Sequence, residues 1–142
     1  MTGYLIDSSA LWRILRDRSV LECWRATLAD GDFRSCYPQR SEFLTSARNL
    51  KEYSDHCRMF DTLYRDVAVP KSAGQWIGNV QYRAAERGSH RCLSAVDLQI
   101  CATAAHHGLV IVHDDADFVA ATRLSAELQQ TNVHEGPRGP VG

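Results

Sequence analysis

Apolar residues follow two patterns along the chain, and their alternation predicts the fold. Unbroken apolar runs at residues 4–6 and 109–112 are typical of buried strands in a parallel sheet. Mixed segments at residues 33–37 and 67–70 predict further strands, and the region 124–133 is expected to hold a last edge strand. Helical spacing of apolar residues predicts helices over 11–15, 20–28, 38–49, 51–66, 73–87, 94–107 and 119–123. Strands alternating with helices predict a three-layer α/β/α sandwich around a central parallel sheet.

The first predicted strand ends in a carboxylate, Asp7, which is followed by Ser8 and Ser9. Ser8 or Ser9 suits the N-cap of the next helix, and Asp7 itself is an alternative cap. Ligands of an open parallel sheet bind outside the carboxyl ends of its strands. Asp7 is therefore predicted to lie where chemistry can take place.

Two further acidic residues lie at predicted helix starts. Glu42 follows Pro38 in the first turn of a helix, where a carboxylate also complements the helix dipole. Asp97 lies three residues after Ser94, which is the spacing of a capping box. Glu42 and Asp97 can therefore each be explained by a structural role, and this is the alternative to a functional one.

A third group of acids, Asp114, Asp115 and Asp117, directly follows the strand at residues 109–112. A turn and a helix cap would use at least one of them. Three acids within four residues exceed what capping needs, and their mutual repulsion is costly without a cation nearby.

Neighbouring parallel strands end at the same edge of a sheet, so we expect Asp7 and Asp115 to lie close together. Helices that begin at that edge would bring in Glu42 and Asp97. Such a pocket, built of carboxylates without Cys or His, suits a hard divalent ion such as Mg²⁺ or Mn²⁺. Sites of this kind activate water and stabilise a phosphoryl transition state.

Composition narrows the class of protein. A chain of 142 residues with 44% hydrophobic and 23% charged residues is typical of one globular domain, predicted over residues 1–134. Residues 135–142 are rich in Gly and Pro, which predicts a disordered tail. The net charge of -1 excludes a strongly basic surface for nucleic acid, so such contacts would depend on local basic groups or metal ions.

The five cysteines are scattered without a C-x-x-C pair, which favours reduced thiols over a disulfide framework or a zinc site. No apolar run approaches the ~20 residues of a membrane span, and the N-terminus lacks the pattern of a signal peptide. We therefore expect a cytoplasmic protein that is not associated with a membrane.

Four segments resemble, in order, the motifs of PIN-domain nucleases, and of the VapC ribonuclease toxins of type II toxin–antitoxin pairs in particular. The four segments are residues 5–11, 40–44, 94–102 and 113–118. The resemblance covers nearly the whole chain, although the 124–133 region lacks the clear final apolar strand of the family. It implies a metal-dependent endoribonuclease that leaves 5′-phosphate and 3′-hydroxyl ends.

The resemblance also implies roles for single residues. The catalytic quartet would be Asp7, Glu42, Asp97 and Asp115. The metal ligands would be Asp7, Asp97, Asp115 and Asp117, the last of them as an auxiliary acid. Ser9 matches a small polar residue that supports the site, whereas Asp114 fills a slot that is not counted as a ligand.

The resemblance further implies an RNA substrate (tRNA or rRNA), homodimerisation and inhibition by a cognate antitoxin. Arg40, Arg48 and Arg91 are candidate contacts to RNA, with a solvated charged surface as the alternative for Arg48 and Arg91. Two other functions stay open: a metal-dependent phosphatase acting on small phosphoesters, and a non-catalytic PIN-like module that binds a protein. The intact set of acids argues against the latter, because a binding scaffold has no need of costly like charges.

Overall fold

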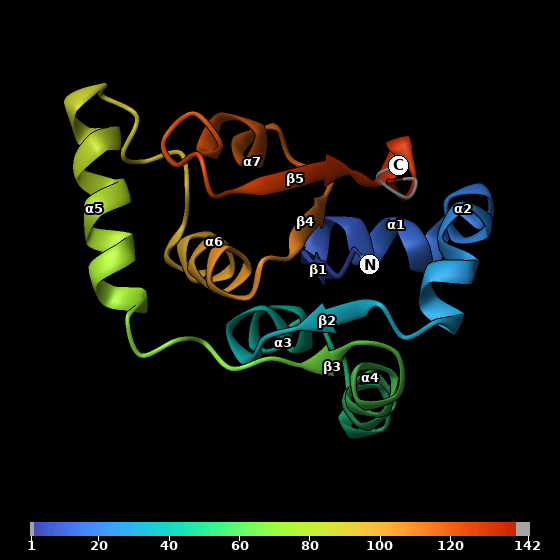
Figure 1. Cartoon of the computed structure of the whole chain (residues 1–142). Helices are drawn as coiled ribbons and strands as arrows, with labels where there is room; N and C mark the ends of the chain where they lie inside the picture. Colours follow the sequence, from blue (N-terminus) through green and yellow to red (C-terminus); the bar gives the residue numbers. More distant parts are fainter. Residues whose placement is uncertain (1, 139–142) are drawn as a thin grey trace.

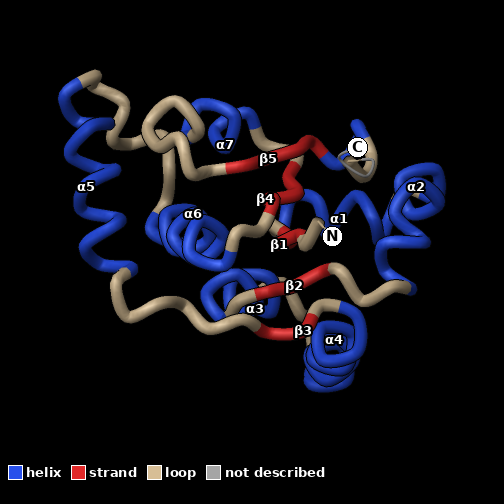
Figure 2. Tube along the Cα trace, viewed as in Figure 1, coloured by secondary structure: helices blue, strands red, loops and turns tan. Residues whose placement is uncertain are grey.

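The computed structural model describes residues 2–138, which fold around one sheet of five parallel strands. The strand order is β3-β2-β1-β4-β5, so the first strand lies in the middle of the sheet. Figure 2 shows the strands side by side between the helices. The strands are β1 (Tyr4–Ile6), β2 (Phe33–Ser35), β3 (Arg65–Asp66), β4 (Val110–His113) and β5 (Gln129–Asn132).

Helices cover both faces of this sheet (Figure 1). Within the described residues they are α1 (Ser8–Arg16), α2 (Arg18–Ala29), α3 (Tyr37–Leu44), α4 (Leu50–Leu63), α5 (Ala73–Glu86), α6 (Ala95–His107) and α7 (Ala116–Ala121), with a 3₁₀ turn, η1 (Val133–Glu135). The predicted three-layer α/β/α sandwich with a central parallel sheet is confirmed. No helix among residues 2–138 is long and apolar enough to cross a membrane.

The two faces of the sheet are separated by the alternation of side chains along the central strands. Tyr4 and Ile6 of β1 point into one apolar cluster, where Trp24 of α2 is fully buried. Leu5 points to the opposite face and packs in a second cluster with Ile111 of β4 and side chains of α6 and α7. Both faces of β1 are therefore buried, which explains why its residues form an unbroken apolar run.

Helix α5 does not cover the sheet but packs on the outer side of α6. Val80 and Ala84 of α5 form a third, smaller cluster with Leu98 of α6 and Leu124, which follows α7. In Figure 1, α5 accordingly stands at the edge of the molecule, with α6 between it and the strands.

The third strand was predicted in the wrong place. The segment at 67–70 was expected to form it, but β3 is Arg65–Asp66, and α4 ends at Leu63. The edge strand β3 pairs with Arg34 and Ser35 and has exposed polar side chains, so its sequence carries no apolar signal. Val67 donates its N–H to the carbonyl of Ser35 at 2.8 Å and then leaves the sheet.

The last described residues pack against the start of the chain. Trp24 Nε1 donates to the carbonyl of Val133 at 2.8 Å, and the backbone N–H of Arg138 donates to the Tyr4 hydroxyl at 3.0 Å. The tail predicted for 135–142 therefore begins with four described residues, of which Glu135 completes η1. Residues 139–142 lie outside the described part of the chain.

Candidate active site

Asp7 lies at the centre of the carboxyl edge of the sheet. Its N–H donates to the carbonyl of Val112 at 2.9 Å, which joins the end of β1 to that of β4. Its side chain is only 5% exposed, and its Oδ2 accepts from the N–H and the hydroxyl of Ser9 at 3.1 and 2.5 Å. The cap of α1 is therefore Asp7 and not Ser8 or Ser9.

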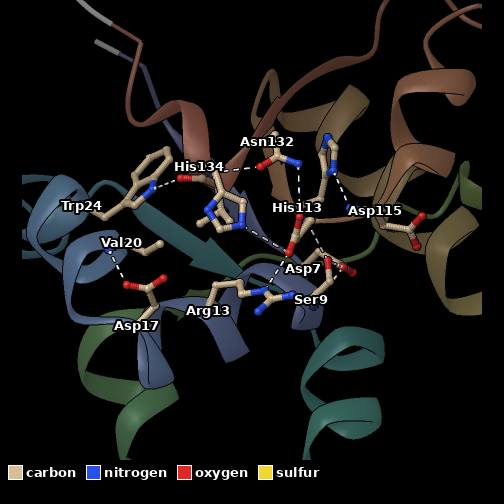
Figure 3. Close-up of polar contacts among 12 residues, drawn as sticks. Asp7, Ser9, Arg13, Asp17, Val20, Trp24, His113, Asp115, Asn132 and His134 are labelled. Carbon is tan, nitrogen blue, oxygen red and sulfur yellow. Dashed lines mark hydrogen bonds and ion pairs between the residues drawn. The ribbon is translucent and has the colours of Figure 1, made fainter.

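Asp115 follows β4 and caps α7, because its Oδ1 accepts from the N–H of Asp117 at 2.9 Å. Ser9 links this segment to the first strand. Its Oγ accepts from the N–H of Asp114 at 2.9 Å while its hydroxyl donates to Asp7. Ser9 thus lies where a supporting residue was predicted, between the first and fourth acids (Figure 3).

Asp97 lies at the third position of α6 in a complete capping box with Ser94. The Ser94 N–H donates to Asp97 Oδ2 at 3.1 Å, and the Asp97 N–H donates to Ser94 Oγ at 3.1 Å. Glu42 differs from its prediction, because α3 begins at Tyr37 and Glu42 falls in the second turn. The helix-dipole explanation considered for Glu42 therefore does not apply.

The five predicted acids interact electrostatically. Burial raises the pKa of Asp7, and the nearby carboxylates of Asp97 and Asp115 raise it further, against the hydrogen bonds from Ser9. Partial burial and the charge of Asp7 raise the pKa of Glu42. Carboxylates from four separate segments of the chain therefore lie close enough to influence one another's pKa.

Asp117 belongs to the same group. Its pKa is raised by partial desolvation and then by the charges of Asp115 and Asp97. Mutual repulsion in a group of like charges is relieved by a cation.

The donor set suits Mg²⁺ or Mn²⁺, since it consists of carboxylate oxygens. As oriented here, no three acidic, His or Cys side chains of residues 2–138 converge in ligating geometry. Asp7, Asp97 and Asp115 each direct an oxygen to a backbone N–H at a helix start. Because Mg²⁺ keeps several waters, one or two direct carboxylates with water-mediated contacts to the others are sufficient.

A buried histidine at the end of β4, which sequence reasoning did not assign to the site, orients Asp115. His113 has no exposed surface, and its Nδ1 accepts from the N–H of Asp115 at 3.0 Å. Because Nδ1 accepts, Nε2 carries the proton and donates to Gln130 Oε1 on β5 at 2.6 Å. The ring packs on Phe118 with centroids 5.3 Å apart. Figure 3 shows His113 above the Asp115 backbone.

Gln39 is a second residue that sequence reasoning missed. Its side chain is fully buried, and its Nε2 donates to Ser8 Oγ at 3.2 Å. The Ser8 hydroxyl in turn lowers the pKa of Glu42 by hydrogen bonding to it, against the larger effect of burial. Gln39 and Glu42 lie three residues apart on α3, a spacing that indicates a shared helix face. Their common partner Ser8 lies in a distant segment, so the sequence did not link it to them.

The side chain of Asp114 is engaged with partners outside the group of acids. Its Oδ2 accepts from Arg13 Nε at 2.7 Å and lies 3.4 Å from His134 Nε2, while Asn132 Nδ2 donates to its Oδ1 at 3.3 Å. The hydrogen bond from Arg13 holds the pKa of Asp114 below its ordinary value. These partners converge in Figure 3.

Arg40 does not fit its predicted contact with RNA, because it is 5% exposed and its guanidinium is engaged internally. Nε donates to Ser35 Oγ at 2.7 Å, Nη1 pairs with Asp61 at 2.8 Å, and Nη2 donates to the carbonyl of Tyr64 at 2.9 Å. Arg40 therefore fastens α3 to β2 and α4. The sequence could not predict these hydrogen bonds, because Asp61 and Tyr64 lie in a different segment of the chain from Arg40.

The other two predicted RNA contacts are exposed. Arg48, between α3 and α4, pairs with Glu52 at 3.1 Å. Arg91 lies in the loop between α5 and α6. Neither position conflicts with the prediction.

Fold and site together define an α/β domain in which carboxylates gather around a buried aspartate at the carboxyl edge of the sheet. The chain belongs to the PIN domain family, whose model matches residues 4–124. It is 54% identical over 99 residues to ribonuclease VapC6 of Mycobacterium tuberculosis, a match that covers 70% of this chain and 78% of the relative.

Solved structures show the same fold at low sequence identity. DNA-bound VapBC from Salmonella typhimurium superimposes with a TM-score of 0.74 at 15% identity, covering 94% of this chain and 99% of that one. VapBC-5 from Mycobacterium tuberculosis, a member of the VapBC family of toxin–antitoxin systems, has a TM-score of 0.62 at 17% identity over 93% and 99% of the two chains.

Proposed function

We propose that the protein is the toxin of a type II toxin–antitoxin pair and acts as a metal-dependent endoribonuclease. The observation that carries this proposal is the group of acids around Asp7, which stays electrostatically unsatisfied within the chain. The 54% identity to a ribonuclease favours RNA as the substrate over small phosphoesters. The same group of acids disfavours a purely protein-binding module.

Asp7, Asp97 and Asp115 would hold Mg²⁺ or Mn²⁺, with Asp117 assisting from the first turn of α7. When bound, such an ion lowers the pKa of a coordinated water and offsets charge on the scissile phosphate. Glu42 lies at the exposed rim, and its raised pKa suits a group that accepts a proton from the attacking water.

The remaining residues of the site would hold these acids in place. Ser9 fixes Asp7 against the segment after β4, and His113 fixes the backbone of Asp115. A ligand set held through such outer contacts keeps its geometry before the substrate arrives.

The proposed partners are tRNA or rRNA as substrate, a second copy of the chain, and a cognate antitoxin. The structural likeness to VapBC-5, a toxin–antitoxin system, supports the antitoxin. An arginine of an antitoxin could pair with the unsatisfied carboxylates through two hydrogen bonds and so take the place of the metal.

The test is cleavage of purified tRNA and rRNA with Mg²⁺ or Mn²⁺, in wild type and in Asp7→Asn. We expect cleavage that stops in chelator and falls by roughly 100- to 1000-fold in the variant, the size of effect seen when one group that stabilises a transition state is removed. Arg18→Gln, an exposed arginine on α2, is the control. Cleavage that persists in chelator, or is equal in wild type and Asp7→Asn, would contradict the proposal.

A further inference from the structure

A cleft of about 230 Å³ lies beside the acids, between α5, α6, α7 and the loop that joins α5 to α6. Its apolar wall is the small cluster that holds α5 to the rest of the molecule. Val80 and Ala84 come from α5, Leu98 from α6 and Leu124 from the segment after α7. The volume falls below the ~300–1,000 Å³ typical of pockets for drug-sized ligands, so the cleft suits a single ring system.

One of the predicted metal ligands forms part of this cleft. Asp117 lines it together with Ala120, Ala121 and Leu124. These positions are spaced i, i+3, i+4 and i+7, so those within α7 share one face of the helix. Because α7 begins at the acidic edge, the cleft extends from the proposed catalytic acids along the side of α7.

The rim of the cleft is basic, in contrast to the acids at its end. Arg87, which follows α5, and Arg123, which follows α7, are both exposed and line the cleft. Arg87 Nη1 lies 3.4 Å from the carbonyl of Arg123, so the two residues are neighbours across the opening. His90 of the α5–α6 loop lines the same rim. An apolar wall under a cationic rim fits a ligand with a flat apolar part and an anionic part.

We propose that the cleft binds one unpaired nucleobase of the RNA substrate, with an adjoining phosphate on Arg87 and Arg123. This inference rests on the proposed ribonuclease function and assigns to that site a subsite for base selection. Proteins read RNA sequence mainly through unstacked bases, whose faces pack on side chains and whose edges form hydrogen bonds. The amide of Gln81 and the hydroxyl of Ser89 line the cleft and can meet a base edge.

The continuity of the cleft with the acids favours RNA over a peptide as the occupant. A phosphodiester held at the acids places its neighbouring nucleotide within reach of Asp117 and hence of the cleft. Guanidinium groups bind phosphate through paired hydrogen bonds, which suits Arg87 and Arg123 for the backbone of that nucleotide.

The test measures binding without cleavage, in the full chain with chelator present. Labelled single-stranded oligoribonucleotides of one base type are titrated and followed by fluorescence anisotropy. Ala120→Trp fills the cleft from an exposed position, so the fold should be retained. We expect it to weaken binding of the preferred base by roughly tenfold, from the apolar area that the base no longer buries.

Two further variants separate the base from the phosphate. Gln81→Ala should change the order of preference among the four bases. The double variant Arg87→Gln/Arg123→Gln should weaken all oligoribonucleotides alike and reduce the dependence of affinity on salt. Arg18→Gln is the matched control and should change neither the order of base preference nor the salt dependence of the affinity.

An oligoribonucleotide with abasic positions serves as the decisive probe. It should bind equally to wild type and Ala120→Trp, because it has no base to place in the cleft. Equal affinity and equal base preference of wild type and Ala120→Trp would overturn the proposal. So would an effect of Ala120→Trp on antitoxin binding alone, which would make the cleft a protein-docking site.

The outcomes separate this proposal from the ribonuclease assignment. If wild type cleaves RNA but Ala120→Trp has unaltered base preference, the subsite is wrong and the ribonuclease assignment stands. If base-dependent binding is lost in Ala120→Trp but wild type cuts no RNA with Mg²⁺ or Mn²⁺, the cleft is supported and the cleavage assignment fails.

Discussion

Arg40 and Glu42 lie two residues apart on α3 and belong to two different kinds of polar site. Each residue of a helix advances the chain by about 100° around the axis, so residues two positions apart lie on nearly opposite faces. Arg40 points into the protein, where its guanidinium meets Ser35, Asp61 and the carbonyl of Tyr64. Glu42 points to the rim of the acidic group, where its nearest strong electrostatic influence is another carboxylate.

The difference shows how a structural polar group is distinguished from a functional one. A buried charge that is paired and hydrogen-bonded is satisfied within the protein and holds elements together. Carboxylates that raise one another's pKa are satisfied only by something that the chain does not contain. Four predictions test this contrast, from the largest expected effect to the smallest.

The largest loss of stability is expected at Arg40. In Arg40→Met the Ser35 hydroxyl and the carbonyl of Tyr64 each lose the bond from the guanidinium and keep only the hydrogen bond between them, so the free energy of unfolding should fall by about 2–4 kcal/mol. Urea denaturation measures this. Arg48→Met, at an exposed site nearby, should change stability by less than about 0.5 kcal/mol. Equal effects of the two substitutions would contradict a structural role for Arg40.

His113 is expected to affect metal binding at the acidic site through its hydrogen bond with the backbone of Asp115. His113→Phe keeps a buried ring but removes the acceptor of the Asp115 N–H and the donor to Gln130, so Asp115 loses its fixed orientation. Loss of such an outer contact typically lowers metal affinity or activity by about 10- to 100-fold. Calorimetric titration with Mn²⁺ measures the affinity without turnover. His106→Phe, at an exposed position, is the control, and an effect of equal size there would rule out a specific role for His113.

The free energy of unfolding should depend on pH because the buried carboxyl of Asp7 is costly to ionise. Because its pKa is raised in the folded protein, the folded state binds this proton more tightly than the unfolded chain does. The resulting stabilisation of the folded state is complete when the pH is below 3.8, the ordinary pKa of the group. It is lost as the pH rises through the raised pKa of Asp7 in the folded protein.

The measurement is the difference in unfolding free energy between metal-free wild type and Asp7→Asn from pH 3 upward. Wild type should lose stability relative to the variant, on the order of 1 kcal/mol, as the pH passes through that window. Other titrating groups are common to both proteins and cancel. A difference that does not change with pH would show that Asp7 is not destabilised by its charge.

The smallest effect is expected at Asp114, the acid that is paired within the chain. Arg13→Gln removes an ion pair whose arginine is 57% exposed, so it should lower stability by less than about 1 kcal/mol. The loss should shrink further in high salt, because exposed pairs are screened. Thermal unfolding at two salt concentrations measures it. A large, salt-independent loss would place Asp114 among the buried polar groups that Arg40 represents.

The sequence was sufficient to predict those features of the molecule that depend on a pattern within a few neighbouring residues. The apolar run before Asp7, the capping box at Asp97 and the acids after β4 each carry their signal within a few residues. Their convergence then followed from the geometry of a parallel sheet, which brings the ends of adjacent strands together.

Features that depend on distant partners were not accessible in this way. Arg40 is held by Asp61 and Tyr64 of a later segment, and the ring of His113 is fixed by Gln130 on β5, so neither arrangement can be deduced from neighbouring residues. The edge strand β3 lacks an apolar pattern because only its backbone joins the sheet.

The central claim is that the acids around Asp7 form a binding site for a divalent cation, and one experiment tests it directly. Thermal unfolding is compared for wild type and Asp7→Asn, each with and without Mn²⁺. Asn caps a helix as well as Asp does, so the substitution removes the charge and keeps the cap. We predict that metal-free Asp7→Asn is more stable than wild type by about 0.5–2 kcal/mol, as when a functional site is relieved of strain. We also predict that Mn²⁺ stabilises wild type and has little effect on the variant. A less stable variant, or equal stabilisation of both proteins by Mn²⁺, would contradict the claim.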